Sequence, residues 1–362
     1  MNKTSKTKLA IVNFFPIPSV KKAKYKITKY YQSFDYLYEL TNHYDIQVFD
    51  RIGKTVCFNY KKVTFNYFRA FFKSKLIIPI KQFLAIKRFK PDIVFIDGLG
   101  YPHFIVLLKI MLDASTRFIV RDHADRLPRK TLEPLYKLAD RYVESYLFTA
   151  KEMGKEWVDR NIIKSEDKIL ECVEGSTKFS YLENGIKLPS HFLWVGRLDK
   201  NKDPLTILEA FSEYVKTDKK AILKMIFDSD ILFETVKSTI KKNKLESNVI
   251  LIGKVPHADI EHYFRESTFF ILGSYKEGGP FSLIEAMACG CIPIVTNIPA
   301  FKKMLDNGRF GFMYSPGNSE ELKQILFHLK KQDLDFQRKE VLHWFDKELS
   351  NKAIAEKIKQ LD

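Results

Sequence analysis

The chain has 362 residues, of which 45% are hydrophobic and 29% are charged. These fractions are typical of a globular protein and exclude a disordered or collagen-like chain. No apolar run reaches the roughly 20 residues of a membrane-spanning helix, and the apolar stretch after the first lysines is too short for a secretion signal. We therefore expect a cytoplasmic protein. We also expect two domains, because a single core stops growing beyond about 300 residues.

The net charge of +16 is concentrated at the start of the chain. Residues 1–90 contain 19 Lys and Arg residues against four Asp and Glu residues. Such a surface attracts anionic lipid headgroups, a pyrophosphate-linked acceptor or nucleic acid through the same long-range field. Charge alone does not choose among these three partners.

Residues 66–90 interleave aromatic and aliphatic side chains with Lys and Arg. This composition is typical of a helix that lies on an anionic membrane. The alternative is a core helix with a solvated basic face, interrupted at Pro79. The concentration of charge favours the membrane, so we expect a peripheral protein on the inner face of the cytoplasmic membrane. The expected membrane contacts are Phe68, Phe71, Phe72, Lys73 and Lys75.

Strand-like and helical segments alternate along the chain, which predicts βα units around parallel sheets. In the first half the expected strands are residues 8–15, 45–49, 92–97, 117–122 and 168–173. In the second half they are residues 192–196, 222–228, 248–253, 268–274 and 291–297, with helices expected at 205–217, 231–244 and 280–289.

A turn-rich stretch, Glu183–Ser190, separates the two halves and is the expected linker. The expected domains are therefore residues 1–184 and residues 185–335. Residues 336–362 have the pattern of amphipathic helices, and we expect them to pack back toward the N-terminal domain.

The most informative segment is residues 275–297, where a glycine-rich turn lies between a strand and a helix. Gly278 and Gly279 allow a tight turn, and Pro280 suits the first helical turn. The free amides that follow predict an anion site. Glu277 and Glu285 add a carboxylate before the helix and another within it, where each can bind a pair of sugar hydroxyls. Alternatively, both are ordinary surface charges.

The stretch EGGPFSLIEAMACG, with seven residues between Glu277 and Glu285, resembles the Glu-x7-Glu motif of the glycosyltransferase group 1 superfamily, also called family 4. The stretch FLWVGRLDKNKDP resembles that superfamily's diphosphate-binding segment, with Arg197 and Lys202 as its cations. The resemblance implies the GT-B fold, in which two Rossmann-like domains with parallel sheets face each other across a cleft. It also implies a retaining mechanism.

The resemblance also implies roles for individual residues. Glu285 is expected to bind the donor ribose, and Glu277 the transferred sugar. RFIVRDHADRL resembles the strand that ends in a histidine near the reacting phosphate, here His123, and CVEGSTKF resembles the turn before the interdomain crossing. The expected catalytic residues are Glu277, Arg197, Lys202 and His123. The expected donor-binding residues are Glu285, Gly278, Gly279, Phe281, Ser282, Gly253, Lys254 and Val255.

Together these features predict a glycosyltransferase that moves a hexose-type sugar from a UDP- or GDP-linked donor to a glycan or lipid-linked saccharide in cell-surface polysaccharide biosynthesis. Two fixed cations stabilise a leaving diphosphate, so no metal and no cofactor beyond the donor are expected, and nucleic acid is not an expected partner. Two alternatives stay open: a GT-B sugar-nucleotide epimerase or hydrolase, and a non-catalytic nucleic-acid-binding or scaffold protein.

Overall fold

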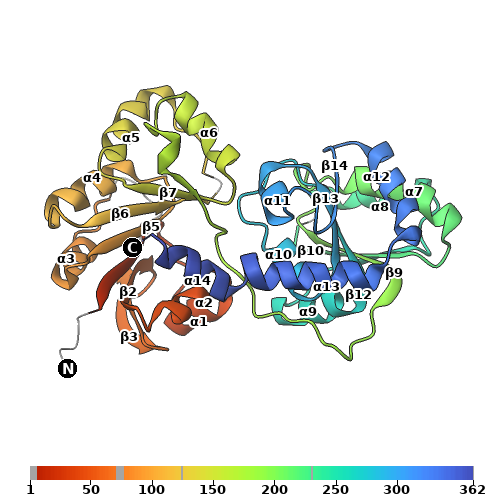
Figure 1. The fold of residues 1–362 in the computed structure, drawn as a ribbon, viewed down its shortest axis with the longest axis horizontal. Coiled ribbons are helices and arrows are strands. Elements are labelled where there is room, and N and C mark those ends of the chain that lie inside the picture. Colours follow the sequence, from red (N-terminus) through yellow and green to blue (C-terminus); the bar gives the residue numbers. More distant parts are fainter. Residues whose placement is uncertain (1–5, 71–76, 124, 230, 362) are drawn as a thin grey trace. The chain divides into compact units, whose positions relative to one another are not determined.

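The structure is a computed structural model that describes residues 6–70, 77–123, 125–229 and 231–361. It divides into two compact units. Residues 1–176 and 354–362 form the first unit, and residues 177–353 form the second. Both units are α/β, as the alternation of segments predicts (Figure 1).

Within the described residues, the first unit contains an eight-stranded sheet in the order β3-β4-β2-β1-β5-β6-β7-β8. Among the described strands of this sheet, only β3 runs against its neighbour, pairing antiparallel with β4 at the edge. The central strands are almost continuously apolar and buried, as is typical of a parallel sheet covered on both faces. The strands are β1 (Thr7–Asn13), β2 (Tyr44–Ile52), β3 (Val56–Tyr60), β4 (Val63–Arg69), β5 (Ile93–Asp97), β6 (Arg117–Arg121), β7 (Ser145–Phe148) and β8 (Ile169–Glu171).

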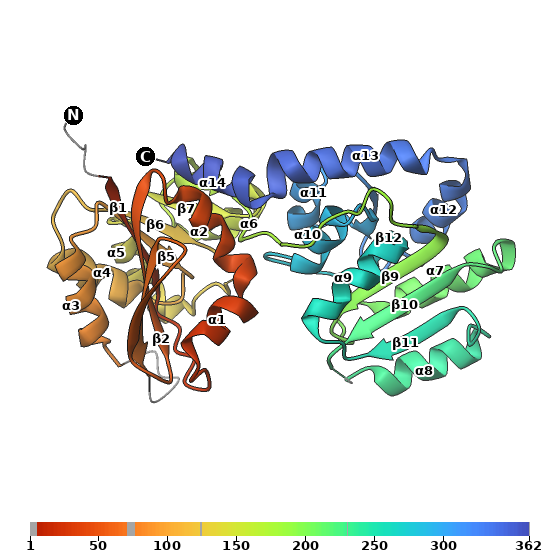
Figure 2. The ribbon, with the colours of Figure 1, turned by 90° about the horizontal axis from the view of Figure 1, so that it is seen from below.

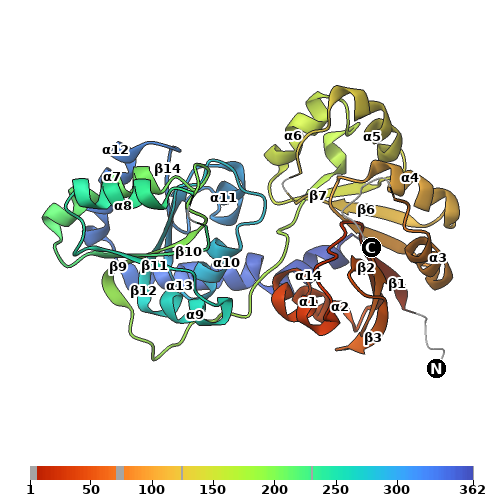
Figure 3. The same ribbon diagram turned by 180° about the vertical axis from the view of Figure 1, so that it is seen from behind.

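Helices cover both faces of this sheet (Figures 1 and 3). Two short helices on one face connect β1 to β2: α1 (Ala23–Lys29) and α2 (Asp35–Leu40). The opposite face is covered by α3 (Ile80–Phe89), α4 (Pro102–Met111), α5 (Glu133–Asp140) and α6 (Lys151–Asp159). The division follows from the strand order, because right-handed crossovers that move in opposite directions from β1 place their helices on opposite faces.

The second unit contains a parallel sheet in the order β11-β10-β9-β12-β13-β14, counted within the described residues. Every residue of β12 is buried, so this strand lies at the centre of the core. The strands are β9 (Leu188–Gly196), β10 (Ile222–Phe227), β11 (Val249–Gly253), β12 (Ser267–Leu272), β13 (Ile292–Thr296) and β14 (Phe312–Tyr314).

The helices of the second unit also form two layers (Figures 1 and 2). One layer contains α7 (Pro204–Thr217), α8 (Phe233–Lys242) and α12 (Ser319–His328). The other contains α9 (His257–Glu266), α10 (Phe281–Ala288) and α13 (Leu334–Trp344), while α11 (Pro299–Met304) connects β13 to β14. This doubly wound arrangement places the loops after β9, β11 and β12 at one edge of the sheet, where ligands of such folds bind.

The unit boundary lies earlier in the chain than the expected linker. Thr177 already belongs to the second unit, and residues 188–190 of the expected linker begin β9. The expected C-terminal helices divide between the units: α13 belongs to the second, whereas most of α14 (Asn351–Lys359) belongs to the first. There, the side chain of Arg117 on β6 donates to the carbonyl of Leu361.

The expected membrane helix over residues 66–90 has a different structure. Residues 66–69 belong to β4, and α3 begins only at Ile80, directly after Pro79. Phe68 lies on this strand, is half-buried and packs against the core of the first unit, so it is not part of a surface helix. Its expected contact with a membrane stays a prediction. This segment instead pairs with β2 as part of β4, in which the buried residues Val63, Phe65 and Tyr67 alternate with less buried ones, as they do in a strand. Phe71, Phe72, Lys73 and Lys75 lie outside the described residues.

Candidate functional site

The predicted donor-binding residues of the second unit lie in three loops that leave one edge of its sheet. Arg197 and Lys202 follow β9, residues 253–255 end β11 and continue from it, and residues 277–282 follow β12. The carboxyl ends of parallel strands meet at the same edge. The structure therefore groups residues that the sequence spreads over more than eighty positions.

Asn201 connects the loop after β9 to the loop after β12. Its carbonyl accepts from the amide of Tyr275 at 2.8 Å. Its side chain donates from Nδ2 to the Lys276 carbonyl at 3.0 Å and accepts the Lys276 amide at Oδ1 at 3.1 Å. Three hydrogen bonds from one residue thus fix these loops side by side.

Gly273 allows this close approach. A Cβ atom at this position would lie 2.9 Å from the carbonyl oxygen of Asp203 and 3.3 Å from that of Lys202. Real Cβ atoms essentially never come closer than 3.0 Å to such atoms. Any side chain here would push the two loops apart.

Lys202 and Glu277 are in direct contact. Nζ of Lys202 lies 2.5 Å from Oε1 of Glu277, and each side chain is only 12% exposed. A charge-assisted hydrogen bond with so little solvent is stronger than a surface ion pair. The predicted phosphate-binding cation and the predicted sugar-binding carboxylate therefore fix each other's position.

Arg197 is more exposed than Lys202. Its side chain is 63% exposed, and Nε lies 3.3 Å from Oδ2 of Asp199 in the same loop. An exposed pair of this kind contributes little to stability. The guanidinium can therefore turn toward an anion at little energetic expense.

Glu285 lies on α10 and is buried, with only 3% of its surface exposed. Its Oε1 lies 2.7 Å from Nε2 of His257, the first residue of α9. The ring of Phe179 stacks on this imidazole, with 5.1 Å between the ring centres. The hydrogen bond to Glu285 raises the pKa of His257 above its usual value, although burial acts in the opposite direction.

His257 was not among the residues that the sequence analysis selected. It lies two residues after the predicted base-binding segment 253–255, and a buried carboxylate requires a donor. Those two facts together could have identified it.

The loops themselves have two unexpected features. Gly253 has a φ of +79°, with nothing within 4 Å of a Cβ atom at that position, so its backbone conformation rather than its packing requires glycine. The Phe281 amide donates to the Gly279 carbonyl at 2.9 Å. This amide is therefore already bound within the turn, although Phe281 was expected to bind the donor.

His123 belongs to the first unit and has its own cluster of partners. Its Nδ1 contacts the carboxylate of Glu174, and its Nε2 lies 3.7 Å from Oδ1 of Asp97. Arg121 lies beneath them, only 1% exposed, and donates to Asp97 from Nε at 3.1 Å and from Nη2 at 2.8 Å. The turn that contains Glu174 thus positions the histidine.

The charges in this cluster are strongly coupled. Burial alone would raise the pKa of Asp97, but Arg121 and His123 together hold it well below its usual range. Arg121 also donates to the Glu174 carbonyl at 2.6 Å and to the Tyr36 hydroxyl at 2.7 Å. Each nitrogen of the guanidinium therefore donates at least one hydrogen bond, which fixes the position of Arg121 beside His123.

Two further observations concern the described residues as a whole. None of their helices has the length and apolar content that a membrane crossing requires. Nor do they contain a group of three or more His, Cys, Asp or Glu side chains arranged to hold a metal ion.

The comparison that decides the family lies within the second unit. A family model described as "Glycosyl transferases group 1" matches residues 184–340, which include both loop cations and both glutamates of the site. Residues 184–340 therefore form a domain of this family. The chain is a glycosyltransferase.

Characterised relatives of this glycosyltransferase support the assignment. The amylovoran biosynthesis glycosyltransferase AmsK of Erwinia amylovora is 24% identical over 320 residues, which cover 80% of this chain and 75% of that protein. The N,N'-diacetylbacillosaminyl-diphospho-undecaprenol alpha-1,3-N-acetylgalactosaminyltransferase of Campylobacter jejuni is 26% identical over 224 residues. That match covers 55% of this chain and 54% of that protein.

Solved structures extend the likeness to the whole chain. A glycosyltransferase from Rickettsia africae has a TM-score of 0.69 and 17% identity, and the match covers 99% of this chain and 98% of that one. At this identity the likeness shows the fold alone. The expected fold class, GT-B with two α/β domains built on parallel sheets, is confirmed.

Proposed function

We propose that this glycosyltransferase moves a hexose-type sugar, with retention of configuration and without a metal ion, from a UDP- or GDP-linked donor to a hydroxyl of a glycan or lipid-linked saccharide. The observation that carries the proposal is the grouping of Lys202, Glu277 and Glu285 at one edge of the second sheet. The two carboxylates can bind sugar hydroxyls and the cation can bind a diphosphate, which together are the groups of a nucleotide-linked sugar.

The roles follow from the chemistry of the donor. Arg197 and Lys202 bind the diphosphate and stabilise the charge that it gains as the glycosidic bond breaks. Glu277 holds hydroxyls of the transferred sugar, and Glu285 holds the ribose hydroxyls. His123 acts from the first unit on the sugar and the reacting phosphate.

The remaining contacts come from the backbone around the donor. Gly253, Lys254 and Val255 border the base. Amides between Gly278 and Ser282 assist at the phosphates, with the exception of the Phe281 amide, which is already used within the turn.

The acceptor is proposed from charge and relatives together. The first 90 residues have a large excess of positive charge, which suits a pyrophosphate-linked acceptor at an anionic membrane surface. One relative is named for the biosynthesis of a polysaccharide, and another for transfer to a diphospho-undecaprenol saccharide. We place the protein at the inner face of the cytoplasmic membrane, in cell-surface polysaccharide biosynthesis.

The first test is donor binding. UDP, GDP and their sugars should raise the melting temperature of the wild type if they bind the folded state. Glu285→Ala should weaken the effect of the correct donor, whereas Glu209→Ala, an exposed change on α7, should not. A donor class that stabilises both variants equally, or no stabilisation by any donor, would count against the site.

Turnover then separates the remaining alternatives. Transfer to an added lipid-linked saccharide in the presence of EDTA, with NMR of the new linkage showing retention, is the expected result. Fast consumption of donor without an acceptor would favour an epimerase or hydrolase. Tight, salt-sensitive binding of nucleic acid without donor binding would favour the scaffold alternative.

A further inference from the structure

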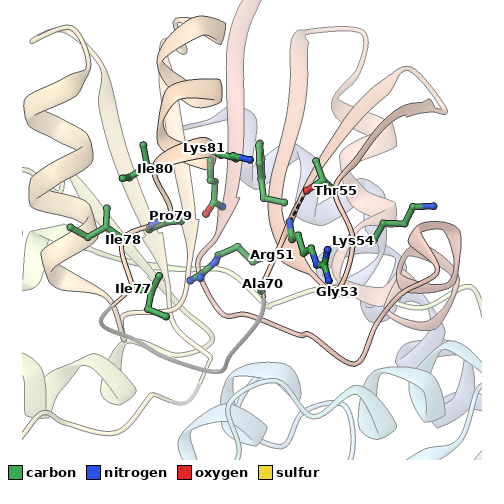
Figure 4. Close-up of a pocket in the computed structure, with 13 residues that line it drawn as sticks. Arg51, Gly53, Lys54, Thr55, Ala70, Ile77, Ile78, Pro79, Ile80 and Lys81 are labelled. Atoms are coloured by element: carbon green, nitrogen blue, oxygen red, sulfur yellow. Dashed lines mark hydrogen bonds between the residues drawn. The ribbon is translucent and has the colours of Figure 1, made fainter.

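The first unit contains an open cavity of about 690 Å³ beyond the carboxyl ends of β2 and β4 (Figure 4). It lies between residues 51–55 on one side and residues 77–82 at the start of α3 on the other. This size suits a small organic ligand. No residue of the donor site lines it, so it has no role in the mechanism described above.

All the charged residues that line the cavity are cations, and the only other polar side chains among its described lining residues are Thr55 and Gln82. Arg51, Lys54, Arg69 and Lys81 contribute to its lining, and no Asp or Glu does so among the described residues. Four cations without a carboxylate attract a multiply charged anion.

Arg51 makes this more than a basic surface. It is only 5% exposed, and its one side-chain hydrogen bond within the described residues goes from Nη1 to the Phe14 carbonyl at 3.3 Å. Burial lowers the pKa of its guanidinium, because no carboxylate compensates the charge. Buried arginines are normally paired, so an anion in the cavity would supply the missing partner.

The opposite wall is apolar and exposed. Ile77, Ile78 and Ile80 are 49%, 47% and 62% exposed, and Pro79 lies between them. Leu84 on the next turn of α3 is 49% exposed as well. Several large aliphatic side chains together at the surface indicate a contact with an apolar partner.

The backbone around the cavity is fixed rather than loose. A Cβ atom at Gly53 would lie 2.2 Å from the Pro18 carbonyl, so only glycine fits there. The Arg69 amide donates to Oγ1 of Thr55 at 3.0 Å, and the Ala70 amide donates to the Ile52 carbonyl at 2.7 Å. The cations of the two strand ends are therefore held at a constant spacing.

We infer that this cavity binds the phosphate-bearing end of a lipid-linked acceptor, with the phosphates on Arg51 and its neighbouring cations and the first part of the hydrocarbon chain on residues 77–80. A free phosphate would not need the aliphatic wall, and a neutral lipid would leave the buried guanidinium unpaired. Only a ligand with both parts satisfies both walls. The inference rests on the proposed function, which it extends by naming where the acceptor's lipid diphosphate binds.

Calorimetry with three soluble probes tests the site on the whole protein: farnesyl diphosphate, inorganic pyrophosphate and farnesol. Farnesyl diphosphate should bind most tightly. Arg51→Met should weaken its binding about tenfold or more, because a charge-assisted hydrogen bond is lost. Arg88→Met, which removes an exposed cation of α3 outside the cavity, should leave binding unchanged.

A second variant guards against misfolding of the first. Ile78→Ser changes an exposed side chain and should weaken farnesyl diphosphate while leaving pyrophosphate unaffected. Equal losses in Arg51→Met and Arg88→Met would mean unspecific attraction and overturn the site. Pyrophosphate binding as tightly as farnesyl diphosphate would overturn the lipid part.

Transfer assays with a polyprenyl-diphosphate saccharide distinguish the two proposals. If transfer occurs and Arg51→Met leaves the KM for this acceptor unchanged, the cavity is not its site and the proposed function stands. If farnesyl diphosphate binding depends on Arg51 but no lipid-linked saccharide is ever a substrate, the proposed acceptor class fails and the lipid phosphate site stands.

Discussion

Nε2 of His257 lies 2.7 Å from Oε1 of Glu285, and the ring of Phe179 stacks on the imidazole. The histidine thereby orients a carboxylate that is proposed to bind the donor ribose. Because the hydrogen bond favours the imidazolium, the strength of this arrangement depends on pH.

The titration of His257 tests the pair directly. Since its folded-state pKa is raised above the usual 6.5, the pair stabilises the fold fully below that pH, and its contribution is lost as the pH rises through the folded pKa. NMR of the imidazole protons should show this pKa fall toward 6.5 in Glu285→Gln. His262 on the same helix, which pairs with Glu266, serves as the internal control. An unchanged titration of His257 would contradict the pairing.

Lys202 and Glu277 should behave as one unit. In a double-mutant cycle with Lys202→Met and Glu277→Gln, we expect a coupling of about 1–3 kcal/mol in the free energy of unfolding, because the pair is largely shielded from water. The exposed pair Glu213–Lys216 on α7 provides the matched control and should couple by about 0.5 kcal/mol or less. Urea denaturation measures both. Equal couplings would show that the shielding is not effective.

Sugar transfer should also depend on Lys202 and Glu277. Each single variant is expected to lower kcat for sugar transfer about a hundredfold, because the cation acts on charge that develops in the transition state. A loss confined to the KM of the donor would instead assign Lys202 to ground-state binding alone.

Substitutions of Gly253 and Gly273 should lower the stability of the second unit for different reasons. Gly253→Ala places a side chain in open space but at a φ of +79°, which costs about 1 kcal/mol of stability. Gly253→Asn should recover part of that loss, since asparagine tolerates this conformation. Gly273→Ala meets the Asp203 carbonyl instead, so Asn at position 273 should be worse than Ala. Thermal unfolding of the four variants checks the order.

Asp97 should be essential to the first unit. Asp97→Asn leaves the buried Arg121 guanidinium without its carboxylate, and we expect a loss of about 3 kcal/mol or more. Because the folded pKa of Asp97 is depressed below the usual 3.8, its stabilisation is present above that pH and is lost only as the pH falls through the folded pKa. Unfolding experiments from pH 2 to 7 measure the onset of this loss, which begins below pH 3.8. Asp113→Asn, an exposed change, is the control.

The second unit could be predicted well because its strands are short, apolar and bounded by turns. All five strands expected there overlap strands of the structure, and of the described strands of this unit only the three-residue β14 was missed. In the first unit the hairpin of β3 and β4 was missed, because residues 66–69 run into a basic, aromatic stretch with the composition of a surface helix. A strand at an edge has no continuous apolar run to identify it.

The candidate site shows the same division. Glu277, Glu285, Arg197 and Lys202 could be selected because a spaced motif identifies them. Asn201 and His257 were not selected, because neither belongs to such a motif and each is recognised by hydrogen bonds to residues distant in sequence. Arg51 could not be selected from the sequence either, because a buried guanidinium without a carboxylate partner is recognised only from its surroundings in the structure.

The first unit is made of two separate pieces of chain, residues 1–176 and residues 354–362. In the second piece Ile354 and Ile358 are buried, and Leu361 accepts a hydrogen bond from Arg117. During synthesis on the ribosome this last piece emerges only after the entire second unit has been made. The unit that begins to be translated first therefore cannot complete its core until the whole second unit has been made.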